Sequence, residues 1–114
     1  MGLDPGRLAR EMHDSAMFAC TAPEGHGYAE CDRARGWWDE HAARAVAAGA
    51  RVTGGLAGAL PAELALAIHD MSVVPCPECD REGGPRNEGC RLRGGSYCIG
   101  KAEALTAAAV RCRR

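Results

Sequence analysis

Four of the seven cysteines lie between residues 76 and 98, and they are the side chains of this chain best suited to chemistry. Cys76 and Cys79 form a Cys-x-x-Cys pair, whose thiolates can both reach one tetrahedral ion at about 2.3 Å. Cys90 and Cys98 follow and would close an all-thiolate site. Because this stretch carries few large apolar side chains, it cannot bury a core of its own. We therefore expect these four cysteines to bind one structural Zn²⁺ that orders the loop.

Two other side chains are candidates for the fourth ligand position. His69 precedes Cys76 by seven residues, and Cys112 lies near the end of the sequence; either could replace Cys98. Four protein ligands leave no open position for water, so such a site stabilises a fold and does not catalyse. The same cysteines could instead hold an iron–sulfur cluster, which the sequence alone does not distinguish from zinc.

A second group of possible ligands, Cys20, His26 and Cys31, lies within 12 residues in the first third of the chain. Its spacings match no compact ligand pair, and free cysteines are commonly buried as small hydrophobic residues. We therefore expect one bound ion per chain, with these three residues in packing and loop positions.

The Cys76-Pro77-Glu78-Cys79 sequence resembles the C-P-x-C knuckle of zinc-ribbon and treble-clef proteins. The similarity covers about 25 residues, and the helix expected after the last candidate ligand is also similar to that of a treble clef. The chain lacks the second Cys-x-x-Cys of those families, because seven residues separate Cys90 from Cys98. The resemblance implies a metal knuckle of zinc-finger type and no particular activity.

Pro75 to Cys79 also resembles the second half of the zinc deaminase signature, in which H-x-E precedes P-C-x-x-C. His41 lies upstream, but Ala43 occupies the position of the proton-transferring glutamate, and no other histidine is followed two residues later by Glu. Without that carboxylate, a zinc-bound water has no general acid or base. A degenerate deaminase-like protein is thus a remote alternative, and we expect no enzyme activity.

The C-P-E-C sequence is similar, too, to the C-P-x-C of glutaredoxin-like thiol oxidoreductases. In those proteins the first cysteine lies at a helix N-terminus after a strand, which lowers its pKa. Here Pro75 and Pro77 flank Cys76, and a Gly-rich segment follows without a visible strand–helix–strand context. A thiol–disulfide redox protein is the alternative function that this resemblance implies.

The elements that must position the cysteines are helices. Capping residues and apolar periodicity predict four of them, from Pro5 to Cys20, from Tyr28 to Ala48, from Pro61 onward, and from Lys101 to Arg113. Residues 49–58 form a Gly-rich linker. We expect strand only in short pieces around the cysteines.

These elements predict a small, mainly α single domain over residues 1–114. Residues 1–74 are its helical part, and residues 75–114 contain the cysteine-rich metal-binding loop and the C-terminal helix. Alanine supplies 22 positions and aromatic residues are scarce, so the core is built from closely spaced helices. Trp37 and Trp38 are adjacent and cannot share one helix face; one should be the main core aromatic.

Charge is divided along the chain. Residues 1–74 carry six basic and ten acidic residues, whereas residues 75–114 carry eight basic and five acidic ones. The basic candidates for partner contact in the cysteine-rich loop are Arg81, Arg86, Arg91 and Arg93. Arginine pairs bidentately with phosphate, but an acidic protein surface explains the charge equally well. The leading hypothesis is a non-catalytic, zinc-stabilised binding or regulatory module with a protein or nucleic-acid partner.

The first residues lack an apolar signal segment, and no run is long enough to cross a membrane. We therefore expect no membrane partner and a reducing, cytoplasmic location, where this cysteine spacing is typical of metal binding. Arginine outnumbers lysine 13 to 1 and alanine is abundant, which is typical of GC-rich coding sequences. An accessory protein of a high-GC bacterium or phage is the source that we expect.

Overall fold

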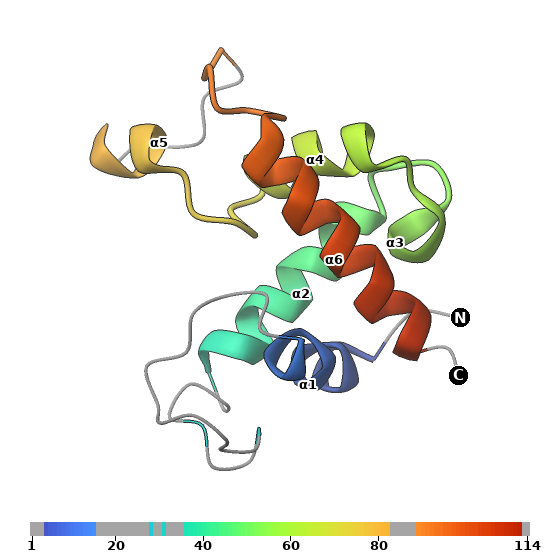
Figure 1. Cartoon of the computed structure of the whole chain (residues 1–114). Coiled ribbons are helices and arrows are strands. Elements are labelled where there is room, and N and C mark those ends of the chain that lie inside the picture. The colour runs from blue at the N-terminus through green and yellow to red at the C-terminus, as the bar shows by residue number, and fades with distance from the viewer. Residues whose placement is uncertain (1–3, 16–27, 29–30, 32–35, 83–88, 113–114) are drawn as a thin grey trace.

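The computed structural model describes residues 4–15, 28, 31, 36–82 and 89–112. These residues form six helices and no strand, which confirms the prediction of a mainly α fold (Figure 1). Four helices have ten residues or more, and two are short. Their bounds are α1 Pro5–Asp14, α2 Trp37–Gly49, α3 Gly55–Gly58, α4 Pro61–Asp70, α5 Pro77–Glu82 and α6 Ser96–Cys112.

The longest helix, α6, packs against α1, α3 and α4 (Figure 1). Its inner face is Ala102, Leu105, Ala108 and Ala109, all fully buried. Alanine lets the helix axes approach closely, which compensates for the small number of large side chains. The larger core residues contributed by the other long helices are Leu8, Met12, Trp38, Leu64 and Ile68.

The first helix begins as predicted and ends earlier than predicted. The Asp4 side chain accepts a hydrogen bond from the Gly6 N–H at 3.1 Å, and Pro5 occupies the first turn. The helix ends at Asp14, with Ser15 as its C-cap, so the prediction that it continues past Asp14 toward Cys20 is wrong. Residues 16–20 lie outside the described residues.

The second helix begins at Trp37, and the predicted start at Tyr28 is wrong. Gly36 is the N-cap, and glycine has one of the lowest helix propensities. Tyr28 instead donates a hydrogen bond to Asp39 Oδ1 at 2.7 Å, in the first turn of α2. Burial, followed by this hydrogen bond, raises the pKa of Tyr28 to about 12.

The adjacent tryptophans divide as predicted. Trp38 is fully buried, whereas Trp37 is half-buried and stacks on His41 with ring centroids 3.9 Å apart. The two indoles meet edge to face at 4.7 Å. Trp38 is thus the main aromatic residue of the core.

The third and fourth predicted helices are α4 and α6. The first of them begins at Pro61 as predicted. The other begins at Ser96, five residues before the predicted start, and therefore includes Cys98. A short helix, α3, also forms within the Gly-rich linker.

Within the described ranges, no helix combines the length and apolar character needed to cross a membrane.

Substitutions at Gly54 and Gly100 test the left-handed backbone conformation of the turn at Gly54. Gly54 has φ +91°, and a Cβ there would lie 2.6 Å from the carbonyl oxygen of Gly58. We expect Gly54→Ala to lower the free energy of unfolding by about 1–3 kcal/mol, because both the left-handed conformation and the backbone contact oppose a side chain. Urea unfolding measures this loss.

Gly100→Ala is the matched control. Gly100 lies in α6 and is exposed, and a methyl group at this position would meet no atom within 4 Å. Alanine should raise the stability there by about 0.5–1 kcal/mol through its higher helix propensity. A Gly54→Ala protein as stable as the wild type would contradict the described turn.

Candidate metal centre

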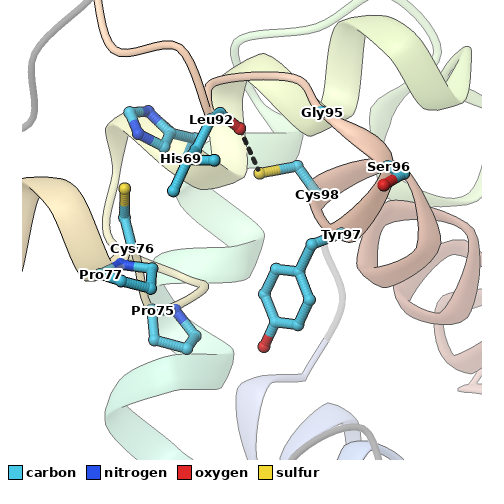
Figure 2. Close-up of a pocket in the computed structure, with 9 residues that line it drawn as sticks. All are labelled: His69, Pro75, Cys76, Pro77, Leu92, Gly95, Ser96, Tyr97 and Cys98. Carbon is cyan, nitrogen blue, oxygen red and sulfur yellow. Dashed lines mark hydrogen bonds between the residues drawn. The ribbon is translucent and has the colours of Figure 1, made fainter.

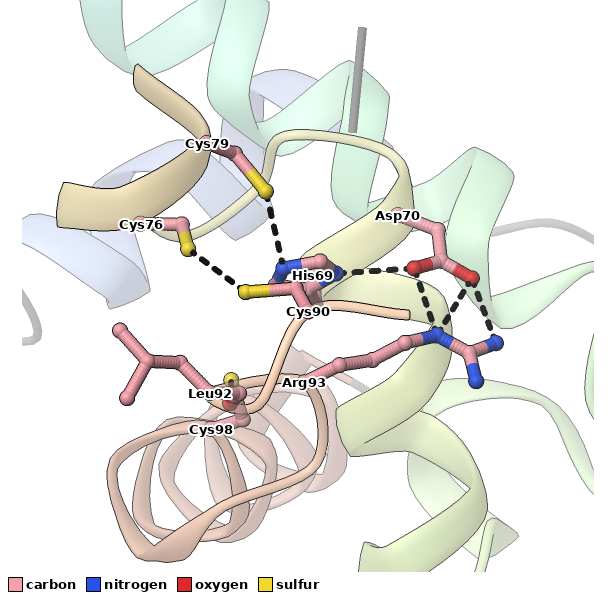
Figure 3. Close-up of polar contacts among 8 residues, drawn as sticks. All are labelled: His69, Asp70, Cys76, Cys79, Cys90, Leu92, Arg93 and Cys98. Atoms are coloured by element: carbon pink, nitrogen blue, oxygen red, sulfur yellow. Dashed lines mark hydrogen bonds and ion pairs between the residues drawn. The ribbon is translucent and has the colours of Figure 1, made fainter. Parts of the chain in front are cut away.

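Four side chains from three segments converge beside the C-terminal end of α4 (Figure 3). His69 comes from the last turn of α4, and Cys90 comes from the segment before α6. Cys76 immediately precedes α5, and Cys79 lies in its first turn. One ligand atom from each residue lies within 4.8 Å of all the others. This group, called the metal group below, could hold a metal ion.

The spacing within the metal group matches a tetrahedral ion. The sulfur atoms of Cys76 and Cys90 are 3.7 Å apart, and Cys79 Sγ lies 3.7 Å from His69 Nε2. A tetrahedron with metal–sulfur bonds of about 2.3 Å has a sulfur–sulfur edge of about 3.8 Å, and the sulfur–nitrogen edge is about 3.5 Å. Both contacts are therefore compatible with one ion at the centre.

A turn at the end of α4 brings Cys76 back to His69. The Ser72 N–H donates to the His69 carbonyl at 3.2 Å, and the Val73 N–H donates to the Ile68 carbonyl at 2.9 Å. These two bonds form a Schellman motif, with Ser72 in the left-handed conformation at φ +59°. Because Val73 and Val74 are buried immediately afterwards, the chain returns along the helix end and delivers Cys76.

Two hydrogen bonds join Cys76, the residue before α5, to Asp80 within that helix. The Cys76 N–H donates to Asp80 Oδ2 at 3.1 Å, and the Asp80 N–H donates to the Cys76 carbonyl at 2.8 Å. This arrangement fixes the first turn of α5, and residues three apart on a helix share a face. Cys76 and Cys79 therefore present their sulfur atoms on the same side.

An aspartate and an arginine orient the imidazole. His69 Nδ1 lies 2.8 Å from Asp70 Oδ1, and His69 is fully buried. Arg93 contacts the same carboxylate in bidentate fashion, with Nε 2.9 Å from Oδ1 and Nη2 2.8 Å from Oδ2. The hydrogen bond from Arg93 is the main cause that lowers the pKa of Asp70. An ionised carboxylate holds a proton on Nδ1, so Nε2 is the ring atom that faces the thiols and can bind a metal.

The electrostatic environment favours the thiolate of Cys76. Burial alone raises its pKa, but hydrogen bonds outweigh burial. They come from the Cys79 backbone, the His69 side chain, and the Cys90 and Cys79 thiols, and they lower the pKa to about 6. A thiolate is the form that coordinates metal, so this position is ready for ligation near neutral pH.

Cys98, the predicted fourth ligand, does not belong to the metal group. It is buried in the first turn of α6, and its Sγ lies 3.6 Å from the Leu92 carbonyl oxygen (Figure 3). The prediction placed it in a loop because the early start of α6 was missed. Gly94 and Gly95 followed by Ser96, a residue type common at helix starts, are the signal that could have revealed this start. His69, predicted only as a substitute, occupies the fourth position.

Two of the remaining candidate ligands, Cys112 and Cys31, lie outside the metal group. Cys112, the other substitute, is buried at the far end of α6. Burial and then the charge of Glu11 raise the pKa of its thiol. Cys31 is buried and belongs to the hydrophobic core. Cys20 and His26, its predicted companions in a second site, lie outside the described residues.

Two of the four arginines predicted for partner contact are engaged in ion pairs. Arg91 Nε lies 2.7 Å from Glu78 Oε1, and Arg93 binds Asp70 as described above. Arg81 is exposed, and Arg86 lies outside the described residues. Arg93 is thus part of the support of the metal group.

A pocket of about 420 Å³ opens beside the metal group (Figure 2). His69 and Cys76 belong to both, and Cys98 lies on the pocket wall. Leu92 and Tyr97 are two of the four exposed large hydrophobic side chains found in the described part of the chain, and both line this pocket. The other lining residues are Pro75, Pro77, Gly95 and Ser96.

Comparison with protein-family models, with curated proteins and with solved structures gave no match to this chain.

Arg93 and Arg91 form a matched pair for testing the support of His69. Arg93→Gln should weaken Zn²⁺ binding by roughly 10–100-fold, because the Asp70 carboxylate loses the partner that holds it against the imidazole. Arg91→Gln removes an exposed ion pair from the same loop and should change the affinity by less than about threefold. Competition titration with a chelator measures both affinities. Equal effects of the two substitutions would contradict an orienting role for Arg93.

Proposed function

We propose that this protein is a non-catalytic binding module stabilised by one Zn²⁺ that His69, Cys76, Cys79 and Cys90 coordinate. The observation that carries the proposal is the convergence of these four ligand atoms within 4.8 Å, from segments separated by up to 21 positions. Three thiolates and one imidazole are a common ligand set of structural zinc sites. Because all four positions of the tetrahedron are filled by protein, the ion has no place for a reactive water.

The same geometry argues against the alternative cofactor and the alternative functions. An iron–sulfur cluster usually takes four cysteines, and Cys98 lies outside the metal group. A dithiol oxidoreductase needs an accessible nucleophile, whereas Cys76 and Cys79 are 2% and 5% exposed. A deaminase needs an open zinc position, and four protein ligands leave none.

Coordination explains how the segment between α4 and α6 is held. The unfolded chain has no preformed site, so the free energy of metal binding contributes directly to folding. Thiolates remain available for zinc in a reducing compartment, which supports the proposal of a cytoplasmic protein.

The metal content provides the first test. Native mass spectrometry should find one Zn²⁺ per chain, and Co²⁺ substitution should give the absorption of a tetrahedral thiolate site. Cys79→Ser should lose the ion and the order of the segment, because it removes one of four ligands. Cys98→Ser, a buried thiol outside the metal group, should keep both. Two bound ions, or equal losses in the two variants, would contradict this assignment.

The partner that we propose is a protein, bound through an apolar side chain that enters the pocket beside the metal group. The pocket has room for one or two large side chains and is bordered by exposed Leu92 and Tyr97. Lys101 lies over the Tyr97 ring at 5.4 Å, and the first turn of α6 carries no acidic residue. An apolar partner residue would fit the pocket beside Leu92 and Tyr97, and an acidic residue after it would meet Lys101. Engagement of Arg91 and Arg93 in ion pairs disfavours nucleic acid.

Peptides selected from a random display library against the zinc-loaded chain test this surface. Selected peptides should carry an apolar–acidic pair, and Tyr97→Ala should weaken their binding by about tenfold or more, as expected for an aromatic contact residue. Leu60→Ser is the control, because Leu60 is 64% exposed at the opposite end of α4. Equal effects of the two substitutions would exclude the pocket. Binding of a duplex or single-stranded oligonucleotide with a steep salt dependence would instead establish a nucleic-acid partner.

A further inference from the structure

Cys76 and Cys90 are placed so that they could form a bond with each other. Their sulfur atoms are 3.7 Å apart, and a disulfide requires about 2.05 Å, so the two side chains must approach by about 1.7 Å in total. The Cys79 thiol also interacts with Cys76, and its sulfur lies 3.7 Å from Nε2 of His69. The choice of the Cys76–Cys90 pair therefore rests on their 3.7 Å approach together with the solvent access of Cys90.

The two cysteines differ in their access to solvent. Cys90 is half-buried, whereas Cys76 is 2% exposed and Cys79 is 5% exposed. A small oxidant from solvent therefore meets Cys90 first. Cys76 lies directly behind it as the second thiolate.

Building on the zinc module proposed above, we propose that hydrogen peroxide oxidises Cys90 and Cys76 to a disulfide and thereby releases the zinc ion. The Cys90 thiolate attacks one peroxide oxygen, which breaks the O–O bond and gives a sulfenic acid and a hydroxide ion. The Cys76 thiolate then attacks the Cys90 sulfur, forms the S–S bond and displaces a second hydroxide ion. The two thiolates lose two electrons, the peroxide gains them, and the hydroxide ions take protons from the solvent.

Zinc keeps two of its four protein ligands after this reaction, His69 and Cys79, and a two-ligand site no longer retains the ion. The reaction is reversible, because a dithiol reductant restores both thiolates. The reaction also alters the wall of the pocket, because Cys76 is one of its lining residues (Figure 2). Oxidation would thus change the surface that we propose for partner binding.

The test uses the zinc-loaded full chain and hydrogen peroxide, with a chelating dye that reports released zinc. We expect one equivalent of zinc to be released and the protein mass to fall by two hydrogen atoms relative to the reduced metal-free chain. Peptide mapping should find Cys76 linked to Cys90. Dithiothreitol and zinc should restore the starting state.

Two kinds of variant control the test. Cys98→Ser and Cys112→Ser remove buried thiols outside the metal group and should leave the release rate within about twofold of wild type. Cys90→His keeps a four-ligand zinc set but cannot form the disulfide, so release should slow by about tenfold or more. If Cys90→His does not hold zinc, the peptide map of the oxidised wild-type chain tests the proposal instead, through the presence or absence of the Cys76–Cys90 link.

The outcomes separate the two proposals. A chain that holds no zinc before oxidation would overturn both of them. A zinc-loaded chain that keeps its ion in peroxide would overturn the redox proposal and leave the zinc module standing. The same conclusion would follow from a Cys76–Cys79 disulfide or from a disulfide between two chains.

Discussion

The close approach of three buried or half-buried sulfur atoms and one imidazole is the constraint on which the segment between α4 and α6 depends. Two thiolates 3.7 Å apart repel each other by about 4.5 kcal/mol at an effective dielectric constant of about 20. A divalent cation between them replaces this repulsion by attraction to every ligand. Without a cation, the two sulfur atoms cannot both be thiolates at this distance. The metal group is therefore a local arrangement whose stability and metal content are linked.

The helical core supplies the fixed frame for this arrangement. His69 is held from two sides, because α4 packs against α6 and the Schellman turn closes immediately after it. Arg93 extends the frame across the chain, since its pairing with Asp70 connects the segment that carries Cys90 to the end of α4. A core rich in alanine contributes less apolar area per residue than one rich in leucine. The proposed metal ligation at one end would therefore have a correspondingly large share in ordering the chain.

Sequence reasoning identified the mainly α fold and three of the four residues that the structure brings together. Proline and aspartate at helix starts, and the Cys-x-x-Cys spacing, are local signals that need no tertiary information. The fourth residue depended on a turn with Ser72, not glycine, in the left-handed conformation, and a non-glycine residue there carries no sequence signal. Cys98 was misplaced for a related reason: Gly100, the fifth residue of α6, resembles a break, although burial of Cys98 and Ala102 on either side stabilises the helix through it.

Cys76 belongs to the metal group and to the pocket, and this sharing has a thermodynamic consequence for the proposed module. A ligand that contacts the pocket wall only when Cys76 is held by the metal must bind the zinc-loaded form more tightly. By reciprocity, the same ligand then raises the affinity for zinc by the same factor. In the proposed module, the position of one sulfur atom would thereby couple metal occupancy, thiol oxidation and partner binding. The residues that would carry this coupling lie where α4, α5 and the start of α6 meet.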